Sequence, residues 1–355
     1  MEQSKRYSRQ IALSEIGSLG QQKLQNAKVL VIGAGGLGCP VLQILAASGV
    51  GTLGIVDGDL VEETNLHRQL LYSIDDCGQN KVDVAAKAIQ NSNAGIKTNV
   101  YPEFINESNI NAIAKDYDIL VDCTDTIAVR YLINDTSAYL NIPMVYASIH
   151  KFEGQISVFN YQEGPSYRCL FPEKESAPIP NCVTTGVLGV IPNTLGMLQA
   201  TEVMKIILGI GSILSGRLLI YNALEISFNE IEFNKSLNQF EIGFEKGKQL
   251  ALNKKQNYEL NKTSFLEKCS LKNYIVIDLR ENQELPKLKY KSVINIPFSE
   301  IEKHQNKFIK NQNIILFCQS GIRSKKALTL FINDGFTNVY HLQNGIQSLQ
   351  LEVTT

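Results

Sequence analysis

Lys28-Val-Leu-Val-Ile-Gly-Ala-Gly-Gly-Leu-Gly38 is the stretch that decides the fold. Its first five residues form a short apolar run rich in β-branched side chains, which predicts a strand, and a helix-compatible segment, Pro40 to Ser48, follows the glycines. Glycine permits positive φ and close backbone approach, so free N–H groups at the helix start can face phosphate oxygens. We therefore expect a phosphate-binding loop built on Gly33, Gly35, Gly36 and Gly38.

A second predicted strand, Thr52 to Val56, ends at Asp57. A carboxylate at this position of a Rossmann unit accepts hydrogen bonds from ribose hydroxyls. Nicotinamide and flavin enzymes share this much of the pattern, so the glycine loop by itself leaves NAD-type binding open.

The residues after Asp57 favour a more highly charged ligand. Charged and amide side chains are dense here, among them Asp59, Asn65 and Arg68, where a Rossmann unit would continue with a plain crossover helix. The planar fork of Arg68 matches phosphate oxygens, and Lys81 supplies a second cation from a helix-like segment. Two cations suit a triphosphate better than a pyrophosphate.

A third apolar strand, Asp118-Ile-Leu-Val-Asp122, carries two carboxylates at its C-terminal end, Asp122 and Asp125. Ligands of open α/β sheets bind at the carboxyl ends of strands, and a carboxylate there can hold Mg²⁺ together with substrate phosphates. For Asp122 we favour the simpler interpretation of a strand-end acid that bonds to its own backbone. Asp125 is the stronger magnesium candidate.

Five motifs in order carry a resemblance to a known family: Arg6-Tyr-Ser-Arg9-Gln10, the glycine loop, Asn65-Leu-His-Arg68-Gln69, Lys81, and Asp122-Cys-Thr-Asp125, with Asp57 between the second and third. They resemble the MoeB/ThiF/HesA family of ubiquitin-activating-like adenylyltransferases over roughly residues 6–230. The resemblance implies that Gly36, Asp57, Asn65, Arg68 and Lys81 contact ATP.

The same resemblance implies that Asp125 organises magnesium and that Arg9 reaches the ATP of a partner subunit, so a homodimer is implied as well. The implied reaction is attack by a C-terminal carboxylate on the α-phosphorus of ATP, which gives an acyl adenylate. That carboxylate is already ionised, so positioning and charge neutralisation suffice without a general base. Thr126 departs from the family, which usually has Asn there.

Composition is consistent with a cytoplasmic enzyme. The chain has 355 residues and a net charge of −1, which suggests two or so domains and gives no sign of nucleic-acid binding. It shows neither an apolar signal core nor about 18 consecutive apolar residues, so neither export nor a membrane span is expected. Seven scattered cysteines favour reduced thiols over a disulfide framework.

One seam divides the chain. Residues 246–262 contain five lysines and little periodic apolar content, so we predict a linker between an adenylation domain at 1–245 and a smaller unit at 258–355. The first domain is predicted to be a Rossmann-like, doubly wound, mainly parallel sheet. Gly154 to Phe159 and Arg217 to Tyr221 are expected as later antiparallel strands, and Leu195 to Leu208 as a helix buried in the core or dimer interface.

In the smaller unit, strand-like Ile314 to Cys318 leads through Gln-Ser-Gly321-Ile-Arg323-Ser324 into a helical pattern. Such a turn aims backbone N–H groups and a helix dipole at the sulfur, which favours the thiolate. The alternative is a buried structural cysteine. With Asp278-Leu-Arg280 and Asn295-Ile-Pro297, the unit resembles an α/β rhodanese domain. The resemblance implies a persulfide on Cys318 in a cradle of Gly321, Arg323 and Ser324.

A further cysteine, Cys182, lies in the Pro-rich stretch Pro180-Asn-Cys-Val-Thr-Thr-Gly186. Its context resembles the crossover-loop cysteine of the adenylyltransferase family, which implies a covalent acyl link to the carrier protein. The alternative is an ordinary loop thiol. We assign no role to Cys39, Cys77, Cys123 and Cys269.

We expect no zinc site. Many relatives hold zinc with two Cys-x-x-Cys pairs, but Ser166-Tyr-Arg-Cys169 has lost one ligand, and no cysteine occurs between Cys182 and Cys269. Tetrahedral zinc needs four ligands, and no histidine between His150 and His304 can substitute.

The combined hypothesis is an adenylyltransferase fused to a sulfurtransferase. ATP and magnesium activate the C-terminal glycine of a ubiquitin-like sulfur carrier ending in Gly-Gly, and the Cys318 persulfide delivers sulfur to give a thiocarboxylate. A cysteine desulfurase or similar protein would supply the sulfur. Molybdenum cofactor synthesis, thiamine synthesis and tRNA thiolation stay open as pathways.

Two alternatives belong to other classes of function. One is an activating enzyme that forms a thioester at Cys182 for protein conjugation, with a regulatory rhodanese unit. The other is a non-catalytic nucleotide sensor or scaffold, which the intact Arg9, Arg68, Lys81 and Asp125 oppose. An NAD oxidoreductase is the weakest interpretation, since it would not explain Lys81.

Overall fold

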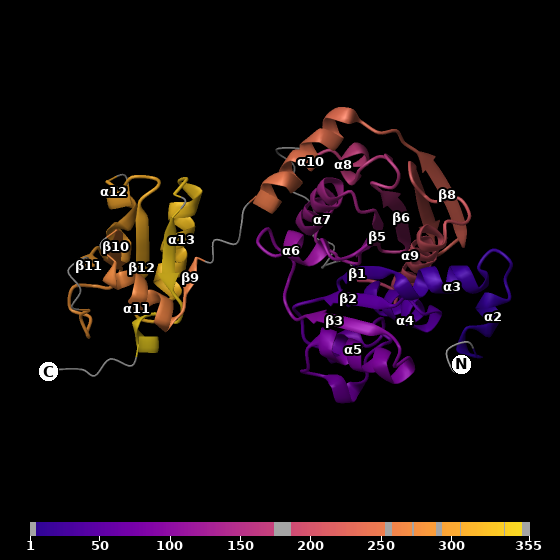
Figure 1. Ribbon diagram of the computed structural model, residues 1–355, viewed down its shortest axis with the longest axis horizontal. Helices are drawn as coiled ribbons and strands as arrows, with labels where there is room; N and C mark the ends of the chain where they lie inside the picture. The colour runs from indigo at the N-terminus through magenta and orange to yellow at the C-terminus, as the bar shows by residue number, and fades with distance from the viewer. Residues whose placement is uncertain are drawn as a thin grey trace. The chain divides into compact units, whose positions relative to one another are not determined.

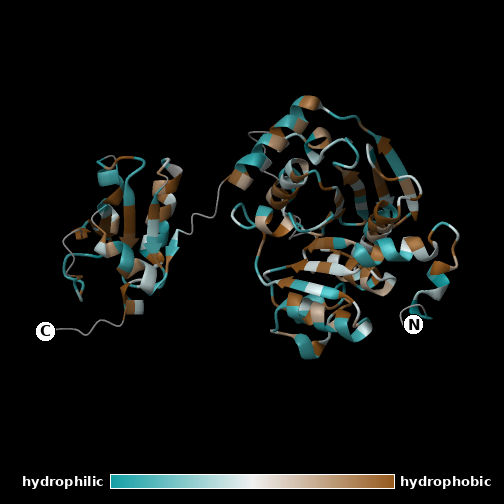
Figure 2. Ribbon diagram, in the orientation of Figure 1, coloured by the Kyte–Doolittle hydropathy of each residue, from teal (hydrophilic) through white to brown (hydrophobic). Residues whose placement is uncertain are grey.

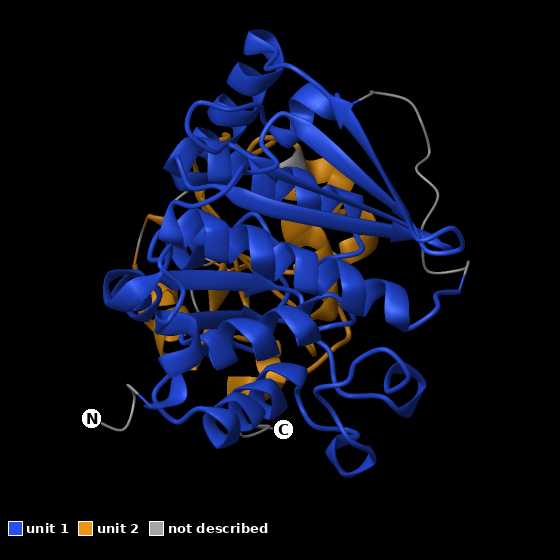
Figure 3. Cartoon of the chain, turned by 90° about the vertical axis from the view of Figure 1, so that its right-hand side faces the viewer, with its two compact units in different colours: residues 1–254 blue, residues 255–355 orange. Residues whose placement is uncertain are grey.

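The computed structural model describes residues 5–173, 186–252, 258–271, 273–288, 293–305, 307–336 and 338–349. The chain divides into two compact units, residues 1–254 and 255–355, which Figure 3 colours separately. Each unit has its own sheet and its own hydrophobic clusters, so each is described by itself.

The first unit is built on an eight-stranded sheet in the order β3-β2-β1-β4-β5-β6-β7-β8 (Figure 1). Strands β1 to β5 pair in parallel, and β6 to β8 continue the sheet with antiparallel pairing. The predicted Rossmann-like sheet with later antiparallel strands is thus confirmed. The strands are β1 Lys28–Ile32, β2 Thr52–Val56, β3 Lys97–Tyr101, β4 Ile119–Asp122, β5 Met144–His150, β6 Glu153–Phe159, β7 Arg217–Asn222 and β8 Ser227–Glu232.

Helices cover both faces of this sheet. They are α2 Ser8–Ile11, α3 Gly17–Asn26, α4 Gly38–Ser48, α5 Lys81–Ser92, α6 Ile110–Ala114, α7 Ile127–Leu140, α8 Tyr167–Leu170, α9 Val190–Leu208 and α10 Leu237–Leu252, with 3-10 turns at Glu63–Asn65 and Ile74–Asp76. Of the helices in the described residues, none is both long and apolar enough to cross a bilayer.

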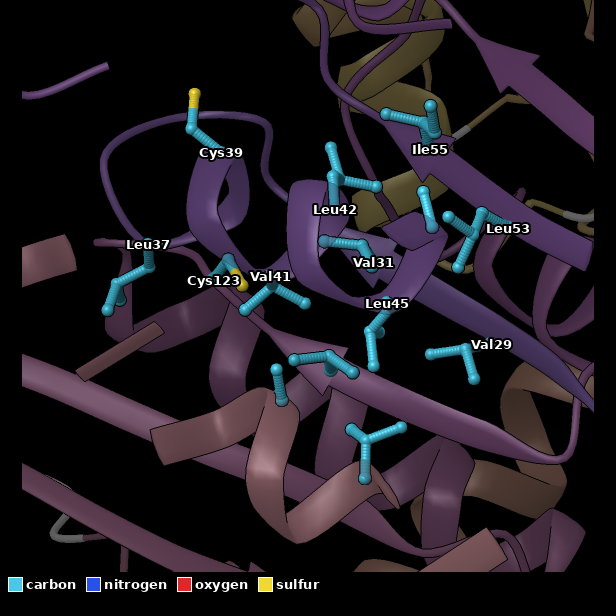
Figure 4. Packing of buried hydrophobic residues seen from close by; sticks show 14 of the residues in the cluster. Val29, Val31, Leu37, Cys39, Val41, Leu42, Leu45, Leu53, Ile55 and Cys123 are labelled. Atoms are coloured by element: carbon cyan, nitrogen blue, oxygen red, sulfur yellow. The ribbon is translucent and has the colours of Figure 1, made fainter. Parts of the chain in front are cut away.

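Strand β1 shows why the sheet needs two covering layers. Successive side chains of a strand point to opposite faces, and here both sets are apolar. Val29 and Val31 pack on one face with Leu42 and Leu45 of α4, as Figure 4 shows, in a cluster that α5 and α9 extend. Leu30 and Ile32 belong to a second cluster, to which α6 and α7 contribute. A run apolar on both faces is typical of buried parallel strands.

Helix α10 corrects the predicted linker. Residues 246–252 continue this helix, and the boundary between the units falls between Lys254 and Lys255. The lysine-rich composition suggested a linker, but the helix has a face that packs on α7. In this contact the rings of Phe244 and Tyr139 have centroids 5.8 Å apart. At the other end, residues 259–262 already belong to β9 and α11 of the second unit.

The second unit is a five-stranded parallel sheet in the order β11-β10-β12-β13-β9. Figure 2 shows hydrophobic residues along its central strand β12. The elements are β9 Glu259–Leu260, α11 Lys262–Ser270, β10 Tyr274–Asp278, β11 Val293–Asn295, α12 Ile301–Gln305, β12 Asn313–Phe317, α13 Ile322–Asn333 and β13 Val339–Leu342, with 3-10 turns at Phe298–Glu300 and Ile346–Leu349. The predicted second, smaller α/β unit is confirmed.

Gly247 gives a test of the contact between α10 and α7. A Cβ on this glycine would lie 2.0 Å from the Asp135 carbonyl oxygen of α7, a backbone atom that cannot move aside. Gly247→Ala should therefore lower the free energy of unfolding of the first unit by about 1–3 kcal/mol. This loss would appear although alanine favours helix by about 1 kcal/mol.

Urea unfolding of the full chain, followed through the transition of the first unit, measures the change. Lys248→Ala is the matched control, because this lysine is exposed on the same helix, and its effect should stay within about 0.5 kcal/mol. A stabilising Gly247→Ala would contradict the close packing described here.

Candidate functional site

A cavity of about 740 Å³ lies in the first unit, where the carboxyl ends of β1, β2 and β4 meet. It is the place where ligands of open α/β sheets bind. Nine of the ten predicted ATP-binding residues line its wall: Gly33, Gly35, Gly36, Asp57, Asp59, Asn65, Arg68, Lys81 and Asp125. The tenth, Gly38, does not.

Gly33 and Gly38 serve the shape of the loop. Gly33 has φ of +98°, and a Cβ on it would lie 2.7 Å from the carbonyl oxygen of Cys123 after β4. A Cβ on Gly38 would lie 2.0 Å from the Gly33 carbonyl oxygen. Only glycine tolerates these approaches, and they bring the start of α4 back toward the strand ends. Gly35 and Gly36 are left to face the cavity.

Asp57 joins the ends of β1 and β2. One of its carboxylate oxygens accepts a hydrogen bond from Ala34 N at 2.8 Å, and the other accepts one from Asp59 N at 2.8 Å. Burial raises the pKa of Asp57 above its ordinary value, while the nearby Lys81 opposes the shift. The carboxylate therefore holds the glycine loop as well as facing the ligand space.

Two of the predicted cations are already held by polar partners. Lys81 is 4% exposed at the first position of α5, and its Nζ lies 2.9 Å from Asp59 Oδ2. Arg68 donates to Asn65 Oδ1 and to the Thr64 carbonyl oxygen at 3.3 Å. Both side chains line the cavity, and these contacts restrict their freedom before an anion binds.

The two carboxylates after β4 have different surroundings. Asp122 is fully buried, and its Oδ1 accepts bonds from the Thr124 N–H and hydroxyl at 3.0 and 2.7 Å, which matches the strand-end role. Burial raises its pKa, and Arg130 opposes the rise. Asp125 is exposed on the cavity wall. Of the two, only Asp125 lines the cavity.

Arg130 lines the cavity and was not predicted. It is 6% exposed in the first turns of α7, with Nη2 bonded to the Thr124 carbonyl oxygen at 3.1 Å and its guanidinium carbon 5.5 Å from the centroid of the Tyr146 ring. Its Nε has no hydrogen-bond partner and lies 3.8 Å from Asp122 Oδ2, which also lacks one. An arginine eight residues after the strand-end Asp122 was the available signal.

Arg9, on α2, is exposed and does not line the cavity of its own chain. Cys182 lies outside the described residues. Gly186 and Val187, the first described residues after it, lie on the cavity wall.

Cys169 sits in a small hydrogen-bonded cluster. Its Sγ accepts from Ser166 N at 3.4 Å and from Ser236 N at 3.3 Å, and the Ser166 hydroxyl is 3.3 Å away. One thiol and two serines tie α8 to the start of α10. This donor set does not fit tetrahedral zinc, which takes Cys, His or carboxylate ligands.

A second chemical centre lies in the second unit. Cys318 follows β12 and is fully buried, and its Sγ accepts from Gly321 N at 3.2 Å and from Ser324 N at 3.4 Å. Gly321 begins α13 with φ of +88°, a conformation that lets the loop turn around the sulfur. Two N–H dipoles and the helix start therefore face the thiol.

Arg323 of the cradle is bound to an acid that sequence analysis did not single out. Its two terminal nitrogens bond to the two carboxylate oxygens of Glu284 at 2.7 and 2.8 Å. The hydrogen bonds from Arg323 lower the pKa of Glu284 to about 2. The cradle's cation is thus balanced, and an anionic substrate has to compete with Glu284 for it.

Three other cysteines have thiol pKa values raised by burial. Burial raises the pKa of Cys39 and of Cys269 to about 12 each, and that of Cys123 well above its ordinary value. Thiols with such values are inert near neutral pH.

Comparison with known families matches both units. The ThiF family model matches residues 7–240, and the rhodanese-like domain model matches residues 261–352. The chain is 44% identical over 241 residues to the sulfur carrier protein adenylyltransferase of Thermus thermophilus, covering 66% of this chain and 89% of that protein.

It is also 38% identical over 349 residues to the adenylyltransferase and sulfurtransferase MOCS3 of Xenopus laevis, covering 91% of this chain and 77% of that protein. Among solved structures, E. coli MccB with ATP superimposes with a TM-score of 0.58 at 26% identity, covering 65% of this chain and 72% of that one.

Proposed function

Because the chain belongs to the ThiF family and carries a rhodanese-like domain, we propose that it adenylates the C-terminal glycine of a small ubiquitin-like sulfur carrier and then transfers sulfur to it. The observation that carries the proposal is the presence in one chain of a cation-lined cavity at the strand ends and of Cys318 in a cradle of N–H groups. Relatives that span both units are named for both activities.

In the first step the cavity holds ATP. A carboxylate oxygen of the carrier attacks the α-phosphorus, and pyrophosphate leaves as the bond to the β-phosphate oxygen breaks. Arg68 and Lys81 neutralise phosphate charge, and the N–H groups at the start of α4 donate hydrogen bonds to phosphate oxygens. Lys81 must turn from Asp59 toward the phosphates. Asp57 takes the ribose, and Asn65 holds Arg68 in place.

Magnesium and a partner subunit complete this site in the proposal. Asp125 is an exposed carboxylate on the cavity wall, and Mg²⁺ binds through one or two such oxygens plus substrate phosphates. When bound, the ion supplies further charge neutralisation. Arg9 is exposed and does not line the cavity of its own chain, which supports assigning it to the ATP of a second copy in a homodimer.

In the second step sulfur replaces the adenylate. The terminal sulfur of a Cys318 persulfide attacks the acyl carbon, the bond to the phosphate oxygen breaks, and AMP leaves with that oxygen. A thiol then attacks Cys318 Sγ, so the acyl sulfur departs as the carrier thiocarboxylate and a disulfide remains. Cys182 is our candidate for this thiol. An upstream persulfide donor, such as a cysteine desulfurase, reloads Cys318 after the disulfide is reduced.

Tethering the two units favours transfer over hydrolysis. A covalent link raises the effective concentration of the persulfide near the adenylate above what a separate protein would give. The identity of the carrier determines the pathway. We place molybdenum cofactor synthesis first, and thiamine synthesis and tRNA thiolation are the other candidates. All of these steps take place in the cytoplasm.

A second candidate function rests on the position of Gly186 and Val187. Both line the cavity wall, and they follow Cys182 by four and five residues in the sequence. A thioester at Cys182 would serve protein conjugation, with the rhodanese unit regulatory. Mass spectrometry of the carrier separates the two functions, because sulfur transfer yields a thiocarboxylate and conjugation yields an isopeptide bond.

ATP–pyrophosphate exchange tests the first step. With a carrier ending in Gly-Gly, wild type should catalyse carrier-dependent exchange, and Asp125→Ala should lower the rate at least about 100-fold, as expected when a group that stabilises transition-state charge is removed. Asp116→Ala, an exposed acid away from the cavity, is the matched control and should keep the wild-type rate. Undiminished exchange by Asp125→Ala would refute the site.

Thiocarboxylate formation tests the second step. Cys318→Ala should retain exchange and lose the thiocarboxylate, because the adenylate forms without a sulfur to displace AMP. Cys77→Ser serves as control, since this cysteine is exposed and has no part in the proposal. Intact mass spectrometry of the carrier gives the answer, and a thiocarboxylate made by Cys318→Ala would show that another donor acts.

Zinc content tests the donor set around Cys169. The purified protein should carry far less than one zinc per chain, and chelation should leave its melting temperature unchanged, whereas a protein with structural zinc unfolds when chelated. Elemental analysis of protein prepared with zinc in the medium is the measurement. A stoichiometric zinc content would overturn this part of the proposal.

A further inference from the structure

Behind the sulfur of Cys318 the second unit holds a line of hydrogen-bonding side chains. Ser324 Oγ is 3.6 Å from Cys318 Sγ, and His341 Nδ1 is 3.3 Å from Ser324 Oγ. On the far side of the imidazole, Nε2 lies 3.4 Å from Glu259 Oε1. The line runs Cys, Ser, His, Glu.

The sheet topology builds this line from four separate elements. Cys318 follows the central strand β12, and Ser324 lies in the first turn of α13. His341 is on β13, the neighbour of β12, and the register of β13 with β9 sets it opposite Glu259. The parallel order β12-β13-β9 therefore places His341 and then Glu259 at increasing distance from Cys318, with Ser324 of α13 next to the sulfur.

The three residues of the line that are nearest the sulfur are buried, which makes their hydrogen bonds important for stability. Cys318 and Ser324 are fully buried, and His341 is 3% exposed. A buried polar group is costly unless it is hydrogen-bonded, so these side chains are held to one another. Burial lowers the pKa of His341 below its ordinary value, although Glu259 opposes the shift. The imidazole is neutral near pH 7 and is able to accept a proton.

The Ser324 hydroxyl has one proton and can donate it to only one acceptor at a time, and this sets the direction of proton transfer along the line. With Nε2–H of the neutral imidazole donated to Glu259, Nδ1 carries a lone pair that accepts the Ser324 O–H. The Ser324 oxygen then accepts the thiol proton of Cys318. The hydroxyl can instead donate to the Gly321 carbonyl oxygen at 3.1 Å, which leaves the relay open.

We propose that Ser324 and His341 form a proton relay that converts the Cys318 thiol to the thiolate, with Glu259 orienting the imidazole. This inference rests on the proposed sulfur transfer and adds its base. The thiol proton passes to Ser324 Oγ as the hydroxyl proton passes to His341 Nδ1, so one thiolate and one imidazolium form together. Ser324 is the catalytic residue, since it touches the reacting sulfur, and His341 and Glu259 are positioning residues.

The relay serves each loading of sulfur. The thiolate attacks the outer sulfur of a persulfide donor, the donor's S–S bond breaks, and the new S–S bond forms on Cys318. The donor leaves as a thiolate and can take the proton stored on His341 back through Ser324. Thiosulfate reacts in the same way and leaves as sulfite. No external oxidant is required, since one sulfur is transferred between two thiols.

Other charged groups face the two ends of the relay. Near Cys318 the charged group is Arg323, which pairs with Glu284, and that ion pair is in turn influenced by Arg280, which pairs with Asp278, and by Glu281. Around His341 they are Glu259 and Lys325, which lie 3.2 Å apart and balance each other. Burial alone would raise the pKa of Glu259, but the hydrogen bonds from Lys325 and His341 bring it below its ordinary value. Glu259 thus stays ionised and can stabilise the imidazolium.

Iodoacetamide alkylation of Cys318 in the full chain tests the relay, with the modified peptide quantified by mass spectrometry. At about pH 7 His341→Gln should react about tenfold more slowly than wild type, and at about pH 10, where thiols ionise without help, the two should agree. Glutamine fills similar space but takes up no proton. His304→Gln, which replaces a half-buried histidine on α12 of the same unit, should follow wild type throughout.

A serine pair separates relay from packing. Ser324→Ala should show the same slow alkylation at about pH 7 as His341→Gln, and Ser324→Thr, which keeps a hydroxyl, should restore most of the rate. Loss by the same factor at every pH, or no loss in His341→Gln, would overturn the proposal. Circular dichroism checks that each variant is folded. Alkylation needs neither ATP nor carrier, so the result stands apart from that of the thiocarboxylate assay.

Discussion

The close approach of backbone segments at the end of β1 is the constraint on which the first unit depends. A side chain at Gly33 would strike the carbonyl after β4, and one at Gly38 would strike Gly33 itself. Their absence lets α4 start against the strand ends, and the Asp57 carboxylate then fastens the loop by accepting the N–H groups of Ala34 and Asp59. The cavity, with its free N–H groups and surrounding cations, follows from this contact.

The second unit applies the same physics to a sulfur atom. A strand end, a glycine with positive φ and a helix start again point backbone N–H groups at one place, here Cys318 Sγ. The two sites differ in the buried residues that lie next to them. In the first unit the buried pair of Asp122 and Arg130 lies at the cavity, and Arg130 lines its wall, whereas in the second unit the neutral side chains of Ser324 and His341 lead away from the thiol. The first site is suited to binding negatively charged phosphates, and the second is suited to removing the proton of the Cys318 thiol.

Local patterns in the sequence predicted the local features well. The apolar run at Lys28–Ile32, its glycines and Asp57 predict a strand, a turn and a strand-end carboxylate within thirty residues, and the structure shows the strand and places Gly33, Gly35, Gly36 and Asp57 on the cavity wall. Features that depend on distant segments were missed. Arg130 becomes a cavity residue only once α7 packs beside β4, and His341 and Glu259 meet only through strand register. The lysine-rich end of α10 looked like a linker because its partner, α7, lies a hundred residues earlier.

The central claim is that one chain makes an acyl adenylate and then passes its own persulfide sulfur to it. The most direct measurement loads Cys318 with heavy-isotope sulfur, removes the excess donor, and adds carrier and ATP for a single turnover. The account predicts that the heavy sulfur appears in the carrier's C-terminal thiocarboxylate and is lost from Cys318. Heavy sulfur that stays on Cys318 while the carrier gains unlabelled sulfur, or none, would contradict it.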